Sequence, residues 1–343
     1  MKILVTGGTG YIGSHTCVEL LENNYEVVIV DNLSNSKIDV LDKLEQITGK
    51  KIKFYLGDVC DKNILEEIFK NEKIDGVIHF AASKAVGESV EQPLMYYRNN
   101  LMSLVTLLEQ MKLHDVYNIV FSSSCTVYGQ PAPEHLPVDE TAPIQVALSP
   151  YGNTKQINEE IIRDEAHADN NLHATILRYF NPIGAHPSAM IGELPNGVPQ
   201  NLLPFVTQTA AKLRPELKVF GNDYNTPDGS CIRDYIYVVD LAKAHVKAVE
   251  RMIHVEDRTQ VEIFNLGTGK GISVLELITT FEKATGVKIP YSIVGRREGD
   301  IEKVWAEPTK ANEVLGWKAD TPIEQVLLSA WNWEKKIRNI TEE

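Results

Sequence analysis

Three side chains in the middle of the chain have types and spacing suited to proton transfer: Ser124, Tyr151 and Lys155. Ser149 can cap a helix whose first position is Pro150, where a backbone N–H is not needed. Tyr151 and Lys155 then lie four residues apart on one face of that helix. A neighbouring ammonium favours the charged form of a phenol and lowers its pKa from about 10. The sequence therefore predicts that Tyr151 serves as a base near neutral pH, directly or through Ser124.

A glycine-rich turn near the start of the chain supplies a second, independent motif. Residues 2–6 and 26–30 are short apolar runs typical of strands, and a helical pattern follows the turn. Gly7, Gly10 and Gly13 permit a tight turn, a close approach of the backbone to a pyrophosphate and close helix packing. The spacing is Gly-x-x-Gly-x-x-Gly rather than the commoner Gly-x-Gly-x-x-Gly, and a purely structural turn is the alternative.

An acidic residue follows the second apolar run, as dinucleotide binding requires. Asp31 lies 18 residues beyond Gly13. Its carboxylate suits the ribose diol of an adenosine and repels a 2′-phosphate, so the pattern favours NAD over NADP.

The tyrosine and lysine motif alone has a simpler alternative, because a tyrosine and a lysine four residues apart arise by chance in many helices, with the ring packed and the lysine solvated. The two motifs together favour a nicotinamide enzyme.

Strand and helix patterns alternate through the first half of the chain, which predicts an α/β fold with a Rossmann-type doubly wound parallel sheet. Further strands are expected at residues 52–56, 76–80, 118–121 and 174–178, and helices at 94–113 and 150–169. The polar motifs follow predicted strands, at the edge where open parallel sheets bind ligands.

The second half of the chain has a different character, with proline and glycine loops around short elements. We expect a Rossmann domain over residues 1–180, with a return near 236–265, and a smaller, interleaved mixed α/β substrate lobe over 181–343. Short elements are expected as a helix at 203–213 and a strand at 218–220, with the return formed by a helix at 240–251 and a strand at 263–266.

The composition excludes several classes of protein. The chain has 343 residues, 43% of them hydrophobic, and a net charge of −13 without a basic cluster, so nucleic acid is a poor partner. Neither a signal segment nor an apolar run of membrane-spanning length is present, and we expect a cytoplasmic protein. No Cys-x-x-Cys pair indicates a zinc site or a disulfide framework among the four cysteines, Cys17, Cys60, Cys125 and Cys231.

Several blocks of the chain resemble the extended short-chain dehydrogenases/reductases, and the resemblance covers nearly the whole sequence. Blocks shared by many members are residues 6–15, 79–82, 178–182 and 233–236. Three more specific blocks are residues 84–89, 220–224 and 296–300, and they resemble members that invert C4 of UDP-hexoses. The resemblance implies NAD-binding residues: Gly7, Gly10, Tyr11, Ile12, Gly13, Asp31, Asn32, Asp58, Val59, Phe80, Ala81, Ala82, Lys84, Asn99, Tyr151, Lys155 and Phe180.

The resemblance also implies a UDP-sugar site, with contacts from Ser124, Tyr151, Asn181, Asn201, Leu202, Phe220, Arg233, Arg297, Asp300 and Val304. Arginine suits diphosphate oxygens, a carboxylate suits ribose hydroxyls, and an aromatic ring offers apolar area beside a uracil. The implied reaction interconverts UDP-glucose and UDP-galactose. The sugar is oxidised to a transient 4-keto form with bound NADH, turns over, and is reduced on its opposite face.

Relatives that dehydrate nucleotide sugars are the main rival. They carry an added Asp-Glu acid/base pair after the active-site threonine or serine, whereas Cys125 and Thr126 follow Ser124 here. Another NAD-dependent nucleotide-sugar epimerase, a dehydrogenase that releases NADH, and a non-catalytic NAD-binding protein are further alternatives. Retention of all three reactive side chains argues against the last of these.

One position bears on the range of sugars. Members restricted to unsubstituted hexoses carry a tyrosine four positions after the Arg-Glu-Gly-Asp block, where this chain has Val304. The smaller side chain predicts room for a 2-acetamido group, and hence activity on UDP-GlcNAc and UDP-GalNAc. The alternative is that Val304 only packs.

Structural rather than catalytic roles are expected for most of the other candidate residues. His79 ends an apolar strand and is expected to be a satisfied histidine near the core, and Cys125 is expected to pack. His186 is a weak candidate, while Glu88 and Asp234 are expected to orient backbone. The resemblance also suggests a homodimer through apolar faces near residues 94–113 and 159–169.

Overall fold

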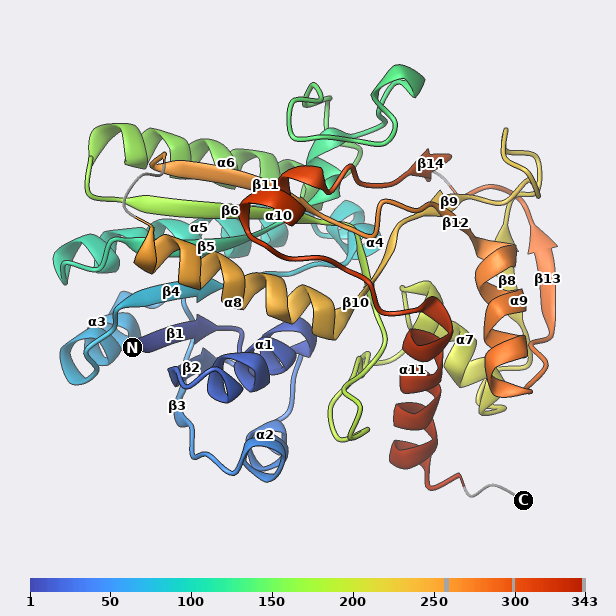
Figure 1. Ribbon diagram of the computed structural model, residues 1–343, viewed down its shortest axis with the longest axis horizontal. Helices are drawn as coiled ribbons and strands as arrows, with labels where there is room; N and C mark the ends of the chain where they lie inside the picture. Colours follow the sequence, from blue (N-terminus) through green and yellow to red (C-terminus); the bar gives the residue numbers. More distant parts are fainter. Residues whose placement is uncertain (256–258, 298–299, 341–343) are drawn as a thin grey trace.

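A seven-stranded parallel sheet forms the core of the larger part of the molecule, on the left in Figure 1. The computed structural model describes residues 1–255, 259–297 and 300–340. The strand order is β11-β6-β5-β4-β1-β2-β3, so the direction of winding reverses between β1 and β4. The strands are β1 (Lys2–Thr6), β2 (Glu26–Asp31), β3 (Lys53–Leu56), β4 (Gly76–His79), β5 (Asn118–Ser124), β6 (His173–Tyr179) and β11 (Val261–Leu266).

Helices cover both faces of this sheet, as the doubly wound prediction requires (Figure 1). Helices α1 (Tyr11–Glu22), α2 (Val40–Thr48) and α8 (Val238–His254) bury apolar residues such as Leu20, Leu44 and Leu241 in one core. The opposite core holds residues of α3 (Lys62–Asn71), α5 (Pro93–Leu113) and α6 (Pro150–Ala168). The expected Rossmann-type fold is therefore confirmed.

The strand predictions hold to within two residues at most ends, with one informative exception. The expected strand 118–121 continues as β5 through Ser122, Ser123 and Ser124. These serines pair with Leu177, Arg178 and Tyr179 of β6, and all three are buried. Serine is a weak strand former, so only the pairing with β6 reveals the full length of β5.

The second half of the chain builds a smaller group of short elements with its own core, which includes Leu203, Phe281 and Trp331. Three small sheets belong to it: β10 (Tyr235–Tyr237) with β7 (Asn181–Ile183), β13 (Tyr291–Val294) with β8 (Leu217–Phe220), and β12 (Ile272–Ser273), β9 (Ile232–Arg233) and β14 (Lys303–Val304) together. Its helices are α7 (Leu202–Ala210), α9 (Val274–Thr285) and α11 (Ile323–Arg338).

Shorter helical segments connect these parts. They are α4 (Val86–Glu91), η1 (Cys125–Tyr128), η2 (Pro133–His135) and α10 (Thr309–Val314). After β10 the chain returns through α8 to β11, which pairs with β6 over residues 261–266 and 174–179. A strand from late in the sequence thus completes the sheet begun by β1. In the described part of the chain, no helix combines the length and the apolar character needed to cross a membrane.

Candidate active site

The residues expected to bind a dinucleotide gather at the carboxyl ends of the sheet strands. Gly7 follows β1, Asp31 ends β2, Asp58 follows β3, Phe80 follows β4 and Ser124 ends β5. Because all these strands are parallel, their carboxyl ends meet at one edge of the sheet. The winding reverses there between β1 and β4, where open α/β sheets bind ligands.

The glycine turn leaves no room for side chains at two of its positions. Gly7 has a φ of +70°, and the amide N of Gly10 donates to its carbonyl oxygen at 3.1 Å. A Cβ at Gly13 would lie 2.3 Å from the same oxygen. Gly10 is the N-cap of α1, and a Cβ added there would lie 3.2 Å from the carbonyl oxygen of Gly7. The first turn of α1 can therefore be approached closely by a phosphate, and the residues fit a dinucleotide.

Asp31 already organises the loop that would surround an adenosine ribose. Its carboxylate accepts from the amides of Thr9 at 3.2 Å and Leu33 at 2.8 Å. Asn32 donates to the carboxylate of Asp58 at 3.1 Å, which joins the loops after β2 and β3. Other expected cofactor residues lie at the same edge: Ile12 in α1, Val59 after β3, Ala81 and Ala82 after β4, Asn99 in α5 and Phe180 after β6.

The expected proton-transfer group assembles where α6 begins. The Ser149 side chain accepts from the amide of Gly152 at 3.1 Å and Pro150 is the first helical residue, so the predicted cap is confirmed. Lys155, which is buried, donates to the carbonyl oxygen of Ser122 at 2.6 Å. Its Nζ lies 5.9 Å from the centre of the Tyr151 ring. Residues far apart in sequence therefore meet at the end of β5.

The expectation of a lowered phenol pKa is wrong for the protein chain alone. Burial raises the pKa of Tyr151 well above its ordinary value, Tyr179 adds to the rise, and a hydrogen bond with Ser124 lowers it by less. Burial also lowers the pKa of Lys155 to about 8, opposed by the charge of Glu159. The Lys155 ammonium bonds to a carbonyl oxygen rather than to the phenol, which explains why removal from water dominates.

Contacts between the two halves of the chain lie beside the glycine turn. The Tyr11 hydroxyl donates to the carbonyl oxygen of Gly184 at 2.7 Å. Lys84 pairs with Glu193 at 3.3 Å, and Asn201 donates to the same carboxylate at 2.6 Å. Sequence reasoning gave Glu193 no role, and no motif marks it. Lys84, an expected cofactor residue, and Asn201, an expected substrate residue, therefore both bind the carboxylate of Glu193.

A second cluster lies in the smaller lobe, where two arginines share one carboxylate. Arg233 on β9 and Arg297 each lie 3.0 Å from an oxygen of Asp300. The Arg297 guanidinium is also 5.7 Å from the centre of the Phe220 ring, which is 40% exposed. Glu298 and Gly299 of the same sequence block lie outside the described residues. The cluster offers two cations, a carboxylate and a ring, which suits a nucleoside diphosphate.

The other expected substrate residues connect this cluster to the sheet. Asn181 is the first residue of β7, and its amide donates to the carbonyl oxygen of Asp234 at 3.0 Å. Leu202 is the first residue of α7. Val304 pairs with Arg233 between β14 and β9, is 2% exposed, and packs in an apolar cluster with Phe180.

The remaining polar candidates have structural partners. The ring of His79 hydrogen-bonds to Thr6 at 2.8 Å, and burial lowers its pKa to about 3, as expected of a neutral histidine near the core. Asp234 accepts from the amides of residues 268, 269 and 306, so it orients backbone as expected. Glu88 accepts from Tyr96 at 2.7 Å and His186 hydrogen-bonds to Ser188 at 2.8 Å, while burial raises the pKa of Cys125 to about 12.

A buried ion pair behind the reactive group was missed by the sequence reasoning. Glu159 and Arg178 are both 2% exposed, and two guanidinium nitrogens of Arg178 meet the two carboxylate oxygens of Glu159. Glu159 lies one helical turn beyond Lys155, and that spacing was the available signal. Without the fold, nothing in the sequence places Arg178 opposite it.

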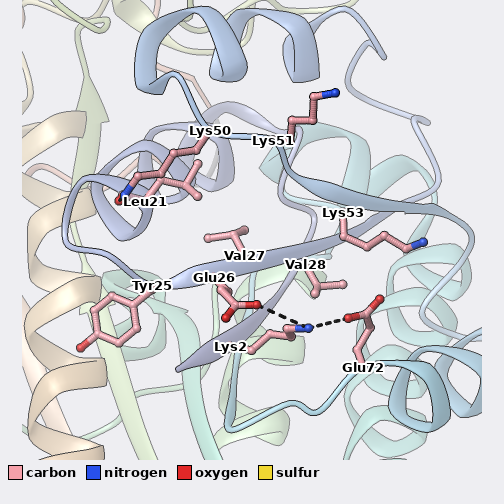
Figure 2. Close-up of a pocket in the computed structure, with 10 residues that line it drawn as sticks. All are labelled: Lys2, Leu21, Tyr25, Glu26, Val27, Val28, Lys50, Lys51, Lys53 and Glu72. Carbon is pink, nitrogen blue, oxygen red and sulfur yellow. Dashed lines mark hydrogen bonds and ion pairs between the residues drawn. The ribbon is translucent and has the colours of Figure 1, made fainter.

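A hollow of about 200 Å³ lies at the other edge of the sheet, where β1, β2 and β3 begin. Figure 2 shows Lys2 held between Glu26 and Glu72, at 3.6 Å and 2.8 Å. The carboxyl ends of the strands, with Ser124 and the glycine turn, lie at the opposite edge. This hollow is therefore separate from the candidate active site.

The parallel sheet, the glycine turn after its first strand and the Ser–Tyr–Lys group define an extended short-chain dehydrogenase/reductase. Residues 4–329 match the family model described as GDP-mannose 4,6 dehydratase. A UDP-glucose 4-epimerase of Bacillus subtilis is 51% identical over 97% of both chains. One from Homo sapiens is 49% identical over 98% of this chain and 97% of its own.

Solved structures agree with these relatives. A UDP-glucose 4-epimerase from Bifidobacterium longum in complex with NAD+ and UDP superposes with a TM-score of 0.94, at 49% identity over 99% of both chains. One from Stenotrophomonas maltophila, with bound NAD and formylated UDP-arabinopyranose, has a TM-score of 0.95 at 46% identity, covering 99% of this chain and 100% of its own. The chain belongs to the UDP-glucose 4-epimerase family.

Proposed function

We propose that this protein interconverts UDP-glucose and UDP-galactose by inverting C4 through a transient 4-keto sugar, with NAD as its cofactor. The observation that carries the proposal is the meeting of Ser124, Tyr151 and Lys155 at the end of β5, at the same edge of the sheet as the glycine turn. Cys125 and Thr126 follow Ser124, and neither supplies the acid/base pair that dehydration needs. Epimerisation is therefore favoured over dehydration, although the family model is described by a dehydratase.

Each member of the reactive group has a distinct proposed role. Tyr151, as the phenolate, removes the proton of the sugar 4-hydroxyl and later returns a proton to the oxygen of the keto sugar. The Ser124 hydroxyl interacts with the phenol, where it lowers the pKa of Tyr151, and it is proposed to pass the proton between the phenol and the sugar. Lys155 holds a positive charge within the same buried region, which favours the phenolate.

The cofactor is proposed to lie along the carboxyl edge of the sheet. Gly7, Gly10 and Gly13 admit its pyrophosphate, and Asp31 accepts from its adenosine ribose. Bound NAD supplies a reversible hydride acceptor for C4 and, when oxidised, a positive ring that favours the charged form of Tyr151. The remaining cofactor residues named from the sequence are proposed to line the same edge.

The substrate is proposed to be held by its nucleotide rather than by its hexose. Arg233 and Arg297 now share Asp300, and a diphosphate would compete for both guanidiniums while Asp300 turns to the uridine ribose. Phe220 offers a partly exposed ring to the uracil, with Asn181, Asn201 and Leu202 completing the site. A hexose with few fixed contacts can turn over between the two half-reactions.

Product analysis tests this function directly. Purified protein mixed with UDP-galactose and no added cofactor is expected to form UDP-glucose, because NAD stays bound through each turnover. Chromatography of the nucleotide sugars measures the product, and the absorbance of an acid extract measures the bound dinucleotide. Accumulation of free NADH would indicate a dehydrogenase, and a 4-keto-6-deoxy product would indicate a dehydratase. Protein that lacks dinucleotide and leaves UDP-galactose unchanged contradicts the proposal.

The size of residue 304 is proposed to set the range of sugars. Val304 pairs with Arg233 across β14 and β9 and is buried in the same apolar cluster as Phe180, so a larger side chain there must displace neighbours or point toward the sugar. Val304→Tyr is expected to lower kcat/KM for UDP-GalNAc at least about tenfold more than for UDP-galactose, by steric exclusion of the acetamido group. Val304→Ala is the matched control and should preserve the ratio. Equal losses on both sugars would refute the steric account.

The protein is also proposed to act as a homodimer in the cytoplasm. Leu94, Met102 and Leu113 of α5 are exposed apolar residues, which supports an interface on that helix. The sulfur atoms of Cys17, Cys60, Cys125 and Cys231 are all free thiols, which supports a reducing compartment.

A further inference from the structure

A single buried carboxylate connects the three elements that surround the reactive group. Glu159 on α6 accepts from the Ser123 hydroxyl on β5 at 2.6 Å and from Nε of Arg178 on β6 at 2.9 Å. It also accepts from Arg163, one turn further along α6, at 2.7 Å. Both Ser123 and Arg178 are fully inside the protein, so these bonds are shielded from competing water.

The contacts with Ser123 and Arg178 lie next to a reacting side chain. Ser123 directly precedes Ser124, and Ser123 is paired with Arg178 across β5 and β6. Glu159 follows Lys155 by four residues on the same helix. A shift of α6 relative to β5 would therefore move Tyr151 and Lys155 away from Ser124. The Glu159 carboxylate opposes that shift by bonding to both strands at once.

The same network extends toward the smaller lobe. Arg178 donates to the Tyr128 hydroxyl at 2.9 Å, and Tyr128 donates to the side chain of Asn265 at 2.7 Å. The side-chain Nδ2 of Asn265 then donates to the carbonyl oxygen of Val138 at 2.9 Å. The Val138 amide donates to the carbonyl oxygen of Trp305 at 2.9 Å, next to Val304. Buried hydrogen bonds thus run from α6 to the strand expected to border the sugar.

We propose that Glu159 is a positioning residue, whose carboxylate holds the α6 helix in register with the strand that presents Ser124 and keeps a negative charge beside Lys155. This inference rests on the proposed function, because it assigns Glu159 a part in that reaction. Glu159 touches neither of the expected ligand sites directly. It acts through Ser123, Arg178 and the buried lysine.

The charge of Glu159 affects the pKa of Lys155, so its removal should change the pH dependence of the reaction, which a general loss of structure would not do. Burial lowers the pKa of Lys155 to about 8, and Glu159 is the charge that opposes this fall. A neutral residue at 159 should lower the pKa of Lys155 further, so the ammonium is lost at a lower pH. Other titratable or charged groups around this region are His79 on β4, Arg178 and Tyr179 on β6, Tyr151 and Arg163 on α6, Tyr96 on α5 and Cys125 on η1.

Steady-state kinetics of Glu159→Gln over a range of pH test the proposal. We expect kcat to fall on the order of 100-fold, because small displacements of reacting groups have effects of that size, while KM for UDP-galactose changes little. The alkaline limb of the kcat profile should move down by about one pH unit. Arg163→Ala is the matched control, since it removes the 40% exposed partner of the same carboxylate and should change kcat by less than about twofold.

Ser123→Ala separates positioning from charge and remains informative if Glu159→Gln does not fold. It removes one bond to the carboxylate but leaves the Glu159 charge, so kcat should fall about threefold to tenfold with the alkaline limb unmoved. Full kcat in Ser123→Ala, or full kcat and an unmoved limb in Glu159→Gln, would overturn the inference. In either case an active wild-type enzyme leaves the proposed function intact, whereas an inactive wild type contradicts that function itself.

Discussion

Tyr151→Phe is expected to abolish conversion of UDP-galactose, with kcat reduced by at least about 10³-fold. The substitution removes one oxygen atom and keeps the ring that packs at the start of α6. That oxygen is the proposed base, and Ser124 is proposed only to relay a proton to it, so a serine hydroxyl of ordinary, much higher pKa is not expected to replace it. Lys155 is already bonded to the carbonyl oxygen of Ser122. The glycine turn and Asp31 are untouched, so NAD should remain bound.

Two measurements check this result. Chromatography of the nucleotide sugars gives the residual rate, and acid extraction followed by absorbance gives the NAD content of each preparation. Tyr97→Phe is a suitable control, because the Tyr97 hydroxyl accepts from Asn153 of α6 at 2.7 Å but lies outside the proposed reactive group. Substantial turnover in Tyr151→Phe would remove the proposed base from the mechanism.

Gly13→Ala is expected to give a protein without bound NAD and therefore without activity. A Cβ at this position would lie 2.3 Å from the carbonyl oxygen of Gly7 and 2.9 Å from Cα of Gly8. Both contacts are with backbone atoms of the turn, which cannot rotate away as a side chain would. The turn must open, and the helix terminus expected to meet the pyrophosphate then moves away from it.

Gly76→Ala is the matched control for this substitution. Gly76 lies at the start of β4, where an added Cβ would meet only ordinary contacts of 3.4 Å or more. This variant should retain NAD and activity. Absorbance of the acid extract and the rate without added cofactor distinguish the two variants, and a full NAD content in Gly13→Ala would contradict the proposed role of the turn.

The central sheet was predictable because the sequence marks it locally. The buried strands β1 and β2 read as apolar runs that end at Gly7 and Asp31, and parallel strands buried on both faces have this pattern. The start of α6 was equally clear, since Ser149 and Pro150 form a cap from adjacent residues. Local signals of this kind do not depend on the rest of the fold.

The smaller lobe was less predictable because its order comes from long-range pairing. Strands β9 and β14 have two residues each, and the paired residues Arg233 and Val304 are 71 positions apart in the sequence. No periodic pattern can be detected in two residues. Helix α9 was overlooked although Ser273 and Glu276 form a capping box that the sequence displays.

The candidate site was predictable in residue type but not in its energetics. The spacing of Tyr151 and Lys155 gave their relative position correctly, yet the direction of the phenol pKa was wrong because burial exceeds the effect of the nearby charge. The burial of Tyr151 depends on the elements that pack around it, β5 and β6, and these are distant in sequence from the start of α6. Glu193 was missed for the same reason, because its partners Lys84 and Asn201 come from distant segments.

The place of β11 at the edge of the main sheet has a consequence for biosynthesis. Its residues, Val261–Leu266, come from late in the chain, yet they cover the open side of β6. While the ribosome is still making this region, a nascent chain has an unpaired strand edge beside its buried serines, and such edges invite association with other chains. Completion of the nucleotide-binding half must therefore wait until most of the polypeptide has emerged.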